Sequence, residues 1–277
     1  MLQTGTQWDR RIERARELAA IYPFAAEILR FYSKLTVLQK DCYFQLKSVL
    51  GFRKRPLQSL PPALDEVDIG FLMTRWSPFL SMIRDEAPPP LAEFARDLNA
   101  RGPAEGAATI QSSWRGSTGS RSKGMTDNAL EVFCAQAFLQ PYAEYLANRT
   151  ALPEQPIRRP TCPLCGSPPL LGVLRPEGDG AKRSLVCSFC RTEWDYLRIA
   201  CPACEEPDER NICVYTTPAF ACVRVEACDT CRCYTNTIDL TKDGLAVPEV
   251  DELAAIPLTL WADGNGYSKV TRNIMGV

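Results

Sequence analysis

Apolar residues in the first part of the chain recur at helical spacing. They follow steps of three or four from Trp8 to Ala19 and again from Phe24 to Cys42, with Pro23 between the two series. This spacing places apolar side chains on one face of a helix, and a proline ends a helix or starts a new one. We therefore expect two successive amphipathic helices at the N-terminus.

Local signals predict further helices and one loop before residue 150. Ser77 followed by Pro78 is typical of a helix start, and residues 90–99 have a helical pattern. Residues 101–124 contain five Gly and five Ser, which indicates a surface loop, and Thr126 is then the expected cap of the next helix.

The pattern changes after the proline-rich segment ALPEQPIRRP, residues 151–160, which we interpret as a stiff linker. Short runs typical of β-strands follow, such as RSLVC and ACVRVEAC, separated by Cys, Pro and Gly. These runs hold too few large apolar residues for a conventional core, so bound metal is expected to supply much of the stability. A helical pattern returns near Val250.

Eight of the 13 cysteines form four CxxC pairs, called knuckles here. Two intervening residues let a tight turn direct both sulfurs at one ion, and a second knuckle about 20 residues later completes a tetrahedron. Successive knuckles are separated by 21, 10 and 23 residues, and only the long intervals have room for a β-hairpin. The predicted first site is Cys162, Cys165, Cys187 and Cys190, and the second is Cys201, Cys204, Cys228 and Cys231.

The other cysteines have less specific surroundings. Cys42 and Cys134 fall on helical patterns, and Cys213 and Cys222 fall in strand-like runs, so we interpret all four as small buried apolar residues. Cys233 follows a knuckle by two residues, and the sequence leaves open whether it is a spare thiol near the metal.

Composition excludes several kinds of chemistry. The chain of 277 residues has no histidine, which rules out Ser-His and Cys-His catalysis and every mixed Cys/His metal site. A four-thiolate ion has no open position for substrate, so we expect no enzyme. Many cysteines without an apolar leader or a long apolar run indicate a cytoplasmic protein without membrane insertion.

Charge argues against a nucleic-acid partner. The formal net charge is -1, and residues 158–233 contain ten basic and ten acidic side chains. Eight thiolates around two divalent ions add about four further negative charges. The four-cysteine region therefore lacks the basic surface that nucleic-acid binding requires, although zinc ribbons as a class often bind nucleic acid.

Several segments resemble the FdhE family of formate dehydrogenase accessory proteins: RARELAAIYPFAAEILRFYSKL, CPLCGSPPLLGVLR, LVCSFCRTEWDYLRIACPAC, EACDTC and WADGNGYSKVTRNIMGV. The resemblance implies a cytoplasmic accessory protein that contacts the molybdenum-containing catalytic subunit of formate dehydrogenase and carries rubredoxin-like sites, which can hold iron. All eight knuckle cysteines are present. Val186 and Asp195 stand where the family tends to have histidine.

The expected fold class is α+β: an irregular N-terminal helical bundle, two tandem rubredoxin-like or zinc-ribbon four-cysteine modules and a C-terminal helix. The expected parts are a helical domain (1–150), a linker (151–160), a first ribbon (161–197), a second ribbon (198–245) and a helical tail (246–277).

Three functions remain open at this point. The first is an assembly protein that contacts its client through Thr192, Glu193, Trp194 and Arg198, residues which could equally support the metal sites. The second is rubredoxin-like electron transfer, and the third is nucleic-acid binding. Zinc and iron share tetrahedral thiolate geometry, so the sequence predicts two ions without choosing between them. It does not specify the oligomeric state.

Overall fold

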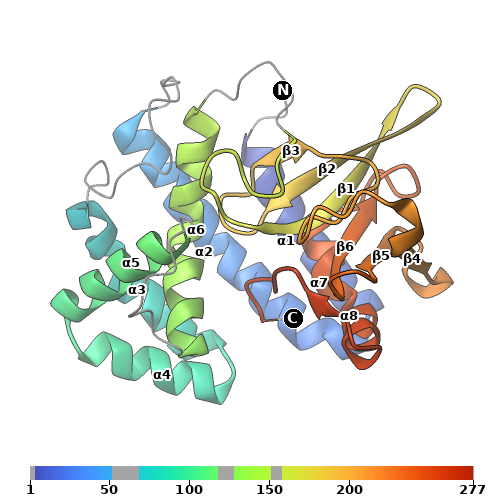
Figure 1. Ribbon diagram of the computed structural model, residues 1–277. Coiled ribbons are helices and arrows are strands. Elements are labelled where there is room, and N and C mark those ends of the chain that lie inside the picture. The colour runs from blue at the N-terminus through green and yellow to red at the C-terminus, as the bar shows by residue number, and fades with distance from the viewer. Residues whose placement is uncertain (1–3, 52–68, 118–127, 151–157, 277) are drawn as a thin grey trace. The chain divides into compact units, whose positions relative to one another are not determined.

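The fold is described by a computed structural model for residues 4–51, 69–117, 128–150 and 158–276 (Figure 1). The chain divides into two compact units. The first comprises Met1–Ser33, Pro153–Pro163 and Pro168–Val277, and the second comprises Lys34–Leu152 and Leu164–Ser167. None of the described helices is both long and apolar enough to cross a bilayer.

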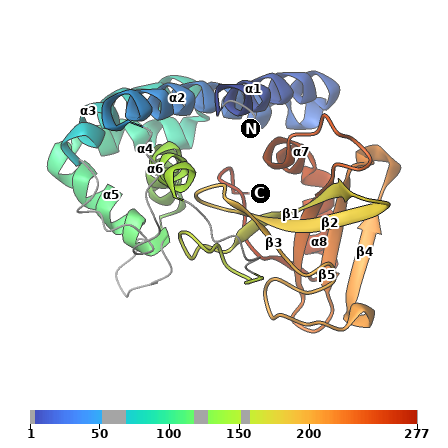
Figure 2. The same ribbon diagram turned by 90° about the horizontal axis from the view of Figure 1, so that it is seen from above.

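The second unit is helical (Figure 2). Its core is aromatic: the Trp76 and Phe138 ring centroids are 4.9 Å apart, and those of Trp114 and Tyr142 are 5.4 Å apart. Gln39 donates to the carbonyl of Ala137 over 2.7 Å. The helices are α2 (Ala26–Leu50), which begins in the first unit, α3 (Ile69–Glu86), α4 (Pro89–Ala100), α5 (Pro103–Ser117) and α6 (Ala129–Arg149).

Two local predictions in this unit are wrong. Pro78 lies inside α3 and does not start a helix, because Trp76, Phe79 and Leu80 are all buried on the same helix and their packing outweighs one missing hydrogen bond. Most of the expected loop at 101–124 is α5, whose Ile110 and Trp114 are buried. Asn128 caps α6, while the expected cap Thr126 lies outside the described residues.

The first unit is built on one seven-stranded sheet. The strand order is β3-β2-β1-β6-β5-β4, and β7 pairs with β6 off this path. The strands are β1 (Pro169–Glu177), β2 (Gly180–Cys187), β3 (Glu193–Asp195), β4 (Ile212–Thr216), β5 (Val223–Cys228), β6 (Cys233–Asp239) and β7 (Ser268–Lys269).

The two expected ribbons are joined in this sheet by the parallel pair β1·β6. The antiparallel hairpin β1·β2 lies on one side of the junction, and the antiparallel strands β4, β5 and β6 lie on the other. Close approach at the junction requires Gly172, because a Cβ there would collide with the Thr237 hydroxyl. The two four-cysteine modules are therefore parts of one hydrogen-bonded structure.

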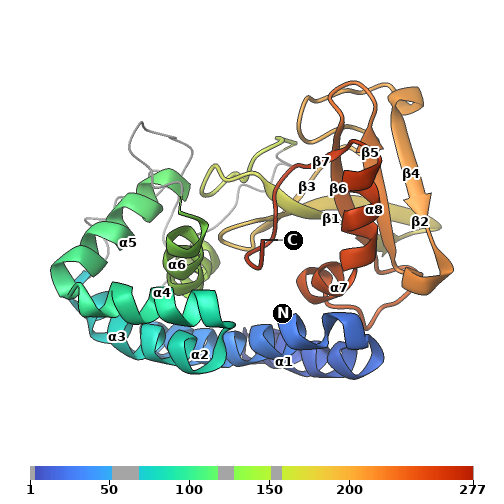
Figure 3. The same cartoon turned by 90° about the horizontal axis from the view of Figure 1, so that it is seen from below.

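Helices from both ends of the chain complete the first unit (Figure 3). Leu258 and Ala262 share a buried apolar cluster with Val225 of β5, and Leu18 shares another with Val250. The helices are α1 (Thr4–Ile21), α7 (Pro248–Ala254) and α8 (Ile256–Gly264), and three short 3-10 turns are η1 (Pro23–Ala25), η3 (Glu209–Asn211) and η4 (Pro218–Phe220).

This grouping differs from the expected helical domain over 1–150. The N-terminal helix packs with α7, and Arg14 of α1 donates to Asp251 over 2.6 Å and to Asp243 over 3.1 Å. An amphipathic pattern identifies the buried face of a helix but not the element that covers it. The sequence therefore predicted α1 without identifying its partner.

Candidate metal centres

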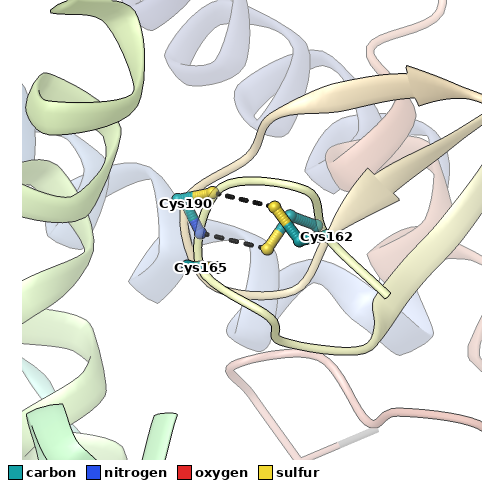
Figure 4. Close-up of side chains that lie close together, drawn as sticks. Cys162, Cys165 and Cys190 are labelled. Carbon is teal, nitrogen blue, oxygen red and sulfur yellow. Dashed lines mark hydrogen bonds between the residues drawn. The ribbon is translucent and has the colours of Figure 1, made fainter. Parts of the chain in front are cut away.

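The eight knuckle cysteines gather into two clusters with the predicted pairing. In each cluster, the four cysteine sulfurs all lie within 4.8 Å of one another. In the first cluster, drawn in part in Figure 4, Cys162 Sγ is 3.6 Å from Cys190 Sγ. In the second, the sulfurs of Cys201 and Cys231 are 3.6 Å apart, and those of Cys204 and Cys228 are 3.7 Å apart.

These separations fit a tetrahedral thiolate ion. Metal–sulfur distances of about 2.3 Å give sulfur–sulfur edges of about 3.8 Å in a regular tetrahedron. A disulfide would require about 2.05 Å between the two sulfurs, well below the observed separations of 3.6 and 3.7 Å. Both donor sets are therefore suited in number, type and spacing to one zinc or iron ion.

The residue directly after each knuckle has a left-handed backbone. The φ angles are 73° at Gly166, 56° at Arg191, 60° at Glu205 and 58° at Arg232. In the second cluster, the N–H groups of Glu205 and Arg232 donate over 2.9 Å to the carbonyls of Cys201 and Cys228, the first cysteine of each knuckle. The four turns therefore share one geometry, although only the first has glycine at the position where L-residues are strained.

Backbone N–H groups point at the knuckle sulfurs. The N–H groups of Phe189 and Cys190 lie 3.3 and 3.4 Å from Cys187 Sγ, and the N–H of Ala203 lies 3.3 Å from Cys201 Sγ. Such donors favour a thiolate over a thiol. The structure thus supplies part of the charge compensation that four clustered thiolates need.

In the second cluster burial and hydrogen bonding oppose each other. Burial raises the pKa of Cys201 although the backbone N–H groups of Cys204 and Ala203 act to lower it. Burial also acts to raise the pKa of Cys228. Hydrogen bonds from the N–H groups of Cys231 and Thr230 and from the neighbouring thiols outweigh burial, so the pKa of Cys228 is lowered. Cys228 is therefore the thiol in this cluster that ionises most readily before an ion binds.

The clusters differ in exposure. All four cysteines of the first cluster are buried, whereas Cys204 is exposed and Cys231 is half-buried. Solvent and small solutes can reach the second cluster directly. An ion held there is more accessible to chelators and to redox partners than an ion in the first cluster.

A buried arginine connects the surroundings of both clusters. Arg183 of β2 is paired with Glu226 of β5 over 2.5 Å, and their side chains are only 1% and 7% exposed. The Nη1 group of Arg183 donates to the carbonyls of Leu197 and Ala200 over 2.9 and 3.1 Å. Arg183 therefore fixes the segment between the second and third knuckles against both halves of the sheet, a role that the sequence did not reveal.

The four expected contact residues have different surroundings. Thr192 Oγ1 is 3.1 Å from Cys190 Sγ, and Glu193 accepts two hydrogen bonds from Arg175 over 2.8 and 2.7 Å. Trp194 is only 4% exposed and donates from Nε1 to the Arg159 carbonyl over 2.8 Å. The fourth residue, Arg198, is exposed. Of the four, Thr192 contacts a cysteine sulfur, Trp194 is buried, and Arg198 is the most exposed.

The remaining cysteines lie outside both clusters. Cys134 is buried in α6, while Cys42, Cys213 and Cys233 are half-buried. Burial raises the pKa of Cys42 to about 11.

Cys222 comes within 4.8 Å of Asp243 and Asp251, a grouping that the sequence did not suggest. Burial raises the pKa of Asp251, although Arg14, which binds both carboxylates, acts to lower it. We interpret this third group as an ion-pair cluster centred on Arg14.

Comparisons with known proteins agree with this architecture. Residues 161–198 match the family model described as FdhE, central domain. A protein FdhE homolog from Aquifex aeolicus (strain VF5) is 28% identical over 271 residues, which cover 95% of this chain and 91% of the relative. One from Yersinia enterocolitica is 26% identical and covers 96% of this chain and 86% of the relative.

The fold matches a solved structure over its full length. The crystal structure of the FdhE protein from Pseudomonas aeruginosa aligns with a TM-score of 0.71 at 23% identity and covers 100% of this chain and 98% of that one. Sequence similarity thus spans the whole chain, the central match contains the first two knuckles, and the fold is shared from end to end. The chain is therefore similar in sequence to FdhE homologs over nearly its whole length and shares the fold of an FdhE crystal structure.

Proposed function

We propose that this protein is a non-catalytic accessory protein in the maturation of formate dehydrogenase and that it binds the catalytic subunit of that enzyme. The observation that carries the proposal is the pair of four-cysteine clusters in a chain that is similar to FdhE homologs over nearly its whole length. The family resemblance supplies the client. Four thiolates fill a tetrahedral site and leave no position at which a substrate or water could be activated, which favours a scaffold over a catalyst.

The eight knuckle cysteines are the proposed ligands of two ions, iron or zinc. An ion of this kind supplies a cross-link between two knuckles, with an apparent binding free energy on the order of 10–16 kcal/mol for structural zinc. Backbone N–H groups donate to the sulfurs of Cys187 and Cys201, and the Thr192 hydroxyl lies beside the sulfur of Cys190. These groups orient the sulfurs and offset part of their negative charge.

We place the client contact on the segment between the second and third knuckles. Leu197 and Ile199 are 41% and 42% exposed, and the exposed Arg198 lies between them. Arg183 holds the carbonyls of Leu197 and Ala200, so this apolar and cationic segment is presented in a fixed conformation. Preorganised apolar and arginine side chains are efficient interface anchors. In this proposal, Thr192, Glu193 and Trp194 contribute to client binding indirectly, because they hold the second knuckle in its conformation.

Co-purification of the formate dehydrogenase catalytic subunit with the tagged full chain tests this proposal. Arg198→Glu and the double change Leu197→Ser with Ile199→Ser are expected to abolish capture while both metal sites stay loaded. Arg210→Glu is the matched control, because Arg210 is also an exposed arginine in the four-cysteine region and pairs only locally, with Asp208. Failure of the unmodified chain to retain the catalytic subunit would refute the client. If the Arg198→Glu and Trp194→Ala variants both retained the catalytic subunit at the wild-type level, the proposed contact segment would be wrong, while the proposed client would stand.

Electron transfer is the second candidate function, and the exposure of Cys204 in the second cluster favours it. Iron in a four-thiolate site has a one-electron couple, whereas zinc has none. Elemental analysis and voltammetry on anaerobically purified protein separate the two functions. Two irons with a reversible couple support electron transfer, and two zincs exclude it.

A further inference from the structure

A cavity of about 230 Å³ in the first unit is lined by an unusual number of arginines. Its walls come from α1, from β1 and β3, from the residue after the second knuckle and from the start of α7. Six charged side chains line it: Arg10, Arg11, Arg175, Arg191, Glu193 and Glu249. Four positive against two negative charges leave the lining of this cavity with a net charge of +2.

Both carboxylates in the cavity wall are already held by guanidinium groups. Arg11 donates from Nε to Glu249, and both side chains are only 10% exposed, so this pair forms the inner wall. The pKa of Glu249 is lowered although burial alone would raise it, because Arg11 and Arg191 lie nearby. Glu193 accepts a bidentate pair from Arg175 and a further hydrogen bond from the Ser184 hydroxyl.

These ion pairs fix the directions of two guanidinium groups. An arginine fork held by a carboxylate on one edge still presents N–H donors on its other edge. The half-exposed Arg175 and the exposed Arg10 lie toward solvent, whereas Arg11 lies deeper. The cavity therefore has a cationic opening, and each of the two carboxylates in its wall is paired with an arginine.

We propose that this cavity is a binding site for a phosphate dianion, either free or as the terminal group of a small phosphorylated molecule. Two surplus positive charges match a dianion, whereas a single carboxylate would leave the cavity charged. Arginine forks bind tetrahedral phosphate oxygens with paired, charge-assisted hydrogen bonds. The small volume suits a phosphate or the end of a larger ligand.

The site adjoins the first metal cluster through the chain itself. Arg191 directly follows Cys190 and takes the left-handed conformation that is common to the knuckles. A ligand bound at Arg191 thus contacts the turn that carries two of the cysteines, and loss of the ion from the first cluster is expected to weaken phosphate binding. This inference concerns a small ligand and does not depend on the proposed client.

Calorimetric titration of the metal-loaded full chain with inorganic phosphate, glycerol phosphate and acetate at constant ionic strength tests the site. Phosphate is expected to bind at least about tenfold more tightly than acetate. Tighter binding of glycerol phosphate than of phosphate would assign the site to organic phosphates, and equal binding would assign it to the free ion. Acetate binding as tightly as phosphate would overturn the assignment.

Two matched variants locate the binding. Arg10→Gln removes one lining charge and is expected to weaken phosphate binding about tenfold. Arg16→Gln removes the same charge from an exposed position on the same helix outside the cavity and is expected to change binding less than twofold. Both positions are exposed, so both variants should fold, and metal content measured after titration excludes stripping of the ions by phosphate. Equal effects of the two variants would show general attraction to a basic helix and refute the site.

Discussion

Four residues after the knuckles have left-handed backbones, and three of them are not glycine. Positive φ costs an L-residue on the order of 1 kcal/mol or more, so these turns persist because the surrounding hydrogen bonds hold them, and the ion proposed for each cluster would hold them further. The sequence revealed this conformation only at Gly166, because Arg191, Glu205 and Arg232 have no local preference for it. The left-handed residue closes each knuckle turn, and the closed turn directs both cysteine sulfurs toward the centre of the cluster.

Replacement of Glu205 by glycine tests this strain. Its φ is 60°, and its side chain is exposed, so Glu205→Gly is expected to raise the free energy of unfolding of the metal-loaded chain by about 1 kcal/mol. Glu205→Ala is the control, because alanine keeps the strain while removing the carboxylate. Urea denaturation of the unmodified chain and of the two variants separates relief of backbone strain from loss of the carboxylate charge. An increase in unfolding free energy that is as large with alanine as with glycine would mean that the charge is responsible.

Exposure predicts the order in which the two clusters release their ions. Cys204 is open to solvent, whereas the first cluster is buried, so a chromophoric chelator should remove the ion of the second cluster first. Cys162→Ser and Cys204→Ser each disable one cluster and assign the two kinetic phases. Loss of the slow phase in Cys204→Ser, or two phases of equal rate in the unmodified chain, would contradict this order.

At the scale of elements, the sheet is one structure because β1 and β6 pair in parallel and because Arg183 of β2 binds Glu226 of β5. Breaking a buried ion pair by removing one partner leaves the other charge desolvated, which costs far more than the loss of an exposed pair. Arg183 also holds two carbonyls of the inter-knuckle segment. Its loss should therefore affect both halves of the sheet.

Arg183→Met is expected to lower the free energy of unfolding by about 3 kcal/mol. Arg224→Met is the matched comparison, because Arg224 also binds Glu226 through Nε over 2.8 Å but is 22% exposed, and its loss should cost about 1 kcal/mol or less. Denaturation midpoints of the metal-loaded proteins measure both changes. Similar losses in the two variants would mean that the buried arginine has no special role.

At the scale of the whole molecule, the sequence predicted the features that depend on the spacing of nearby residues. The cysteine pairing follows from intervals of two and about 20 residues, and the N-terminal helices follow from their apolar periodicity. The partner of α1 could not be predicted, since Arg14 and Asp251 are 237 positions apart. The helix α5 was missed because Gly and Ser favour loops locally, while the burial of Trp114 decides the outcome.

Hydrogen exchange tests whether α1 is stabilised by the unit that contains the sheet. Removal of both ions should release the amide protection of α1 and α7 together with that of the sheet, because α1 and α7 share one apolar cluster and α7 contacts β1 and β6. Helices α3 and α4 belong to the other unit and should keep their protection. Protection of α1 that follows α3 instead of α7 would favour the helical domain over residues 1–150 that the sequence predicted.

The spacing of the knuckle sulfurs also has a consequence for exposure to air. Thiols 3.6–3.7 Å apart, such as Cys201 with Cys231 and Cys204 with Cys228, need only a small movement to reach disulfide bonding distance once no ion separates them. Oxygen can therefore convert a demetallated centre into a covalently closed form that cannot rebind its ion until it is reduced. The metal content of aerobically prepared protein would then depend on how far its thiols had oxidised. Each cluster that closes with two such bonds should lower the mass of the fully reduced chain by about 4 Da, and closure of both clusters should lower it by about 8 Da.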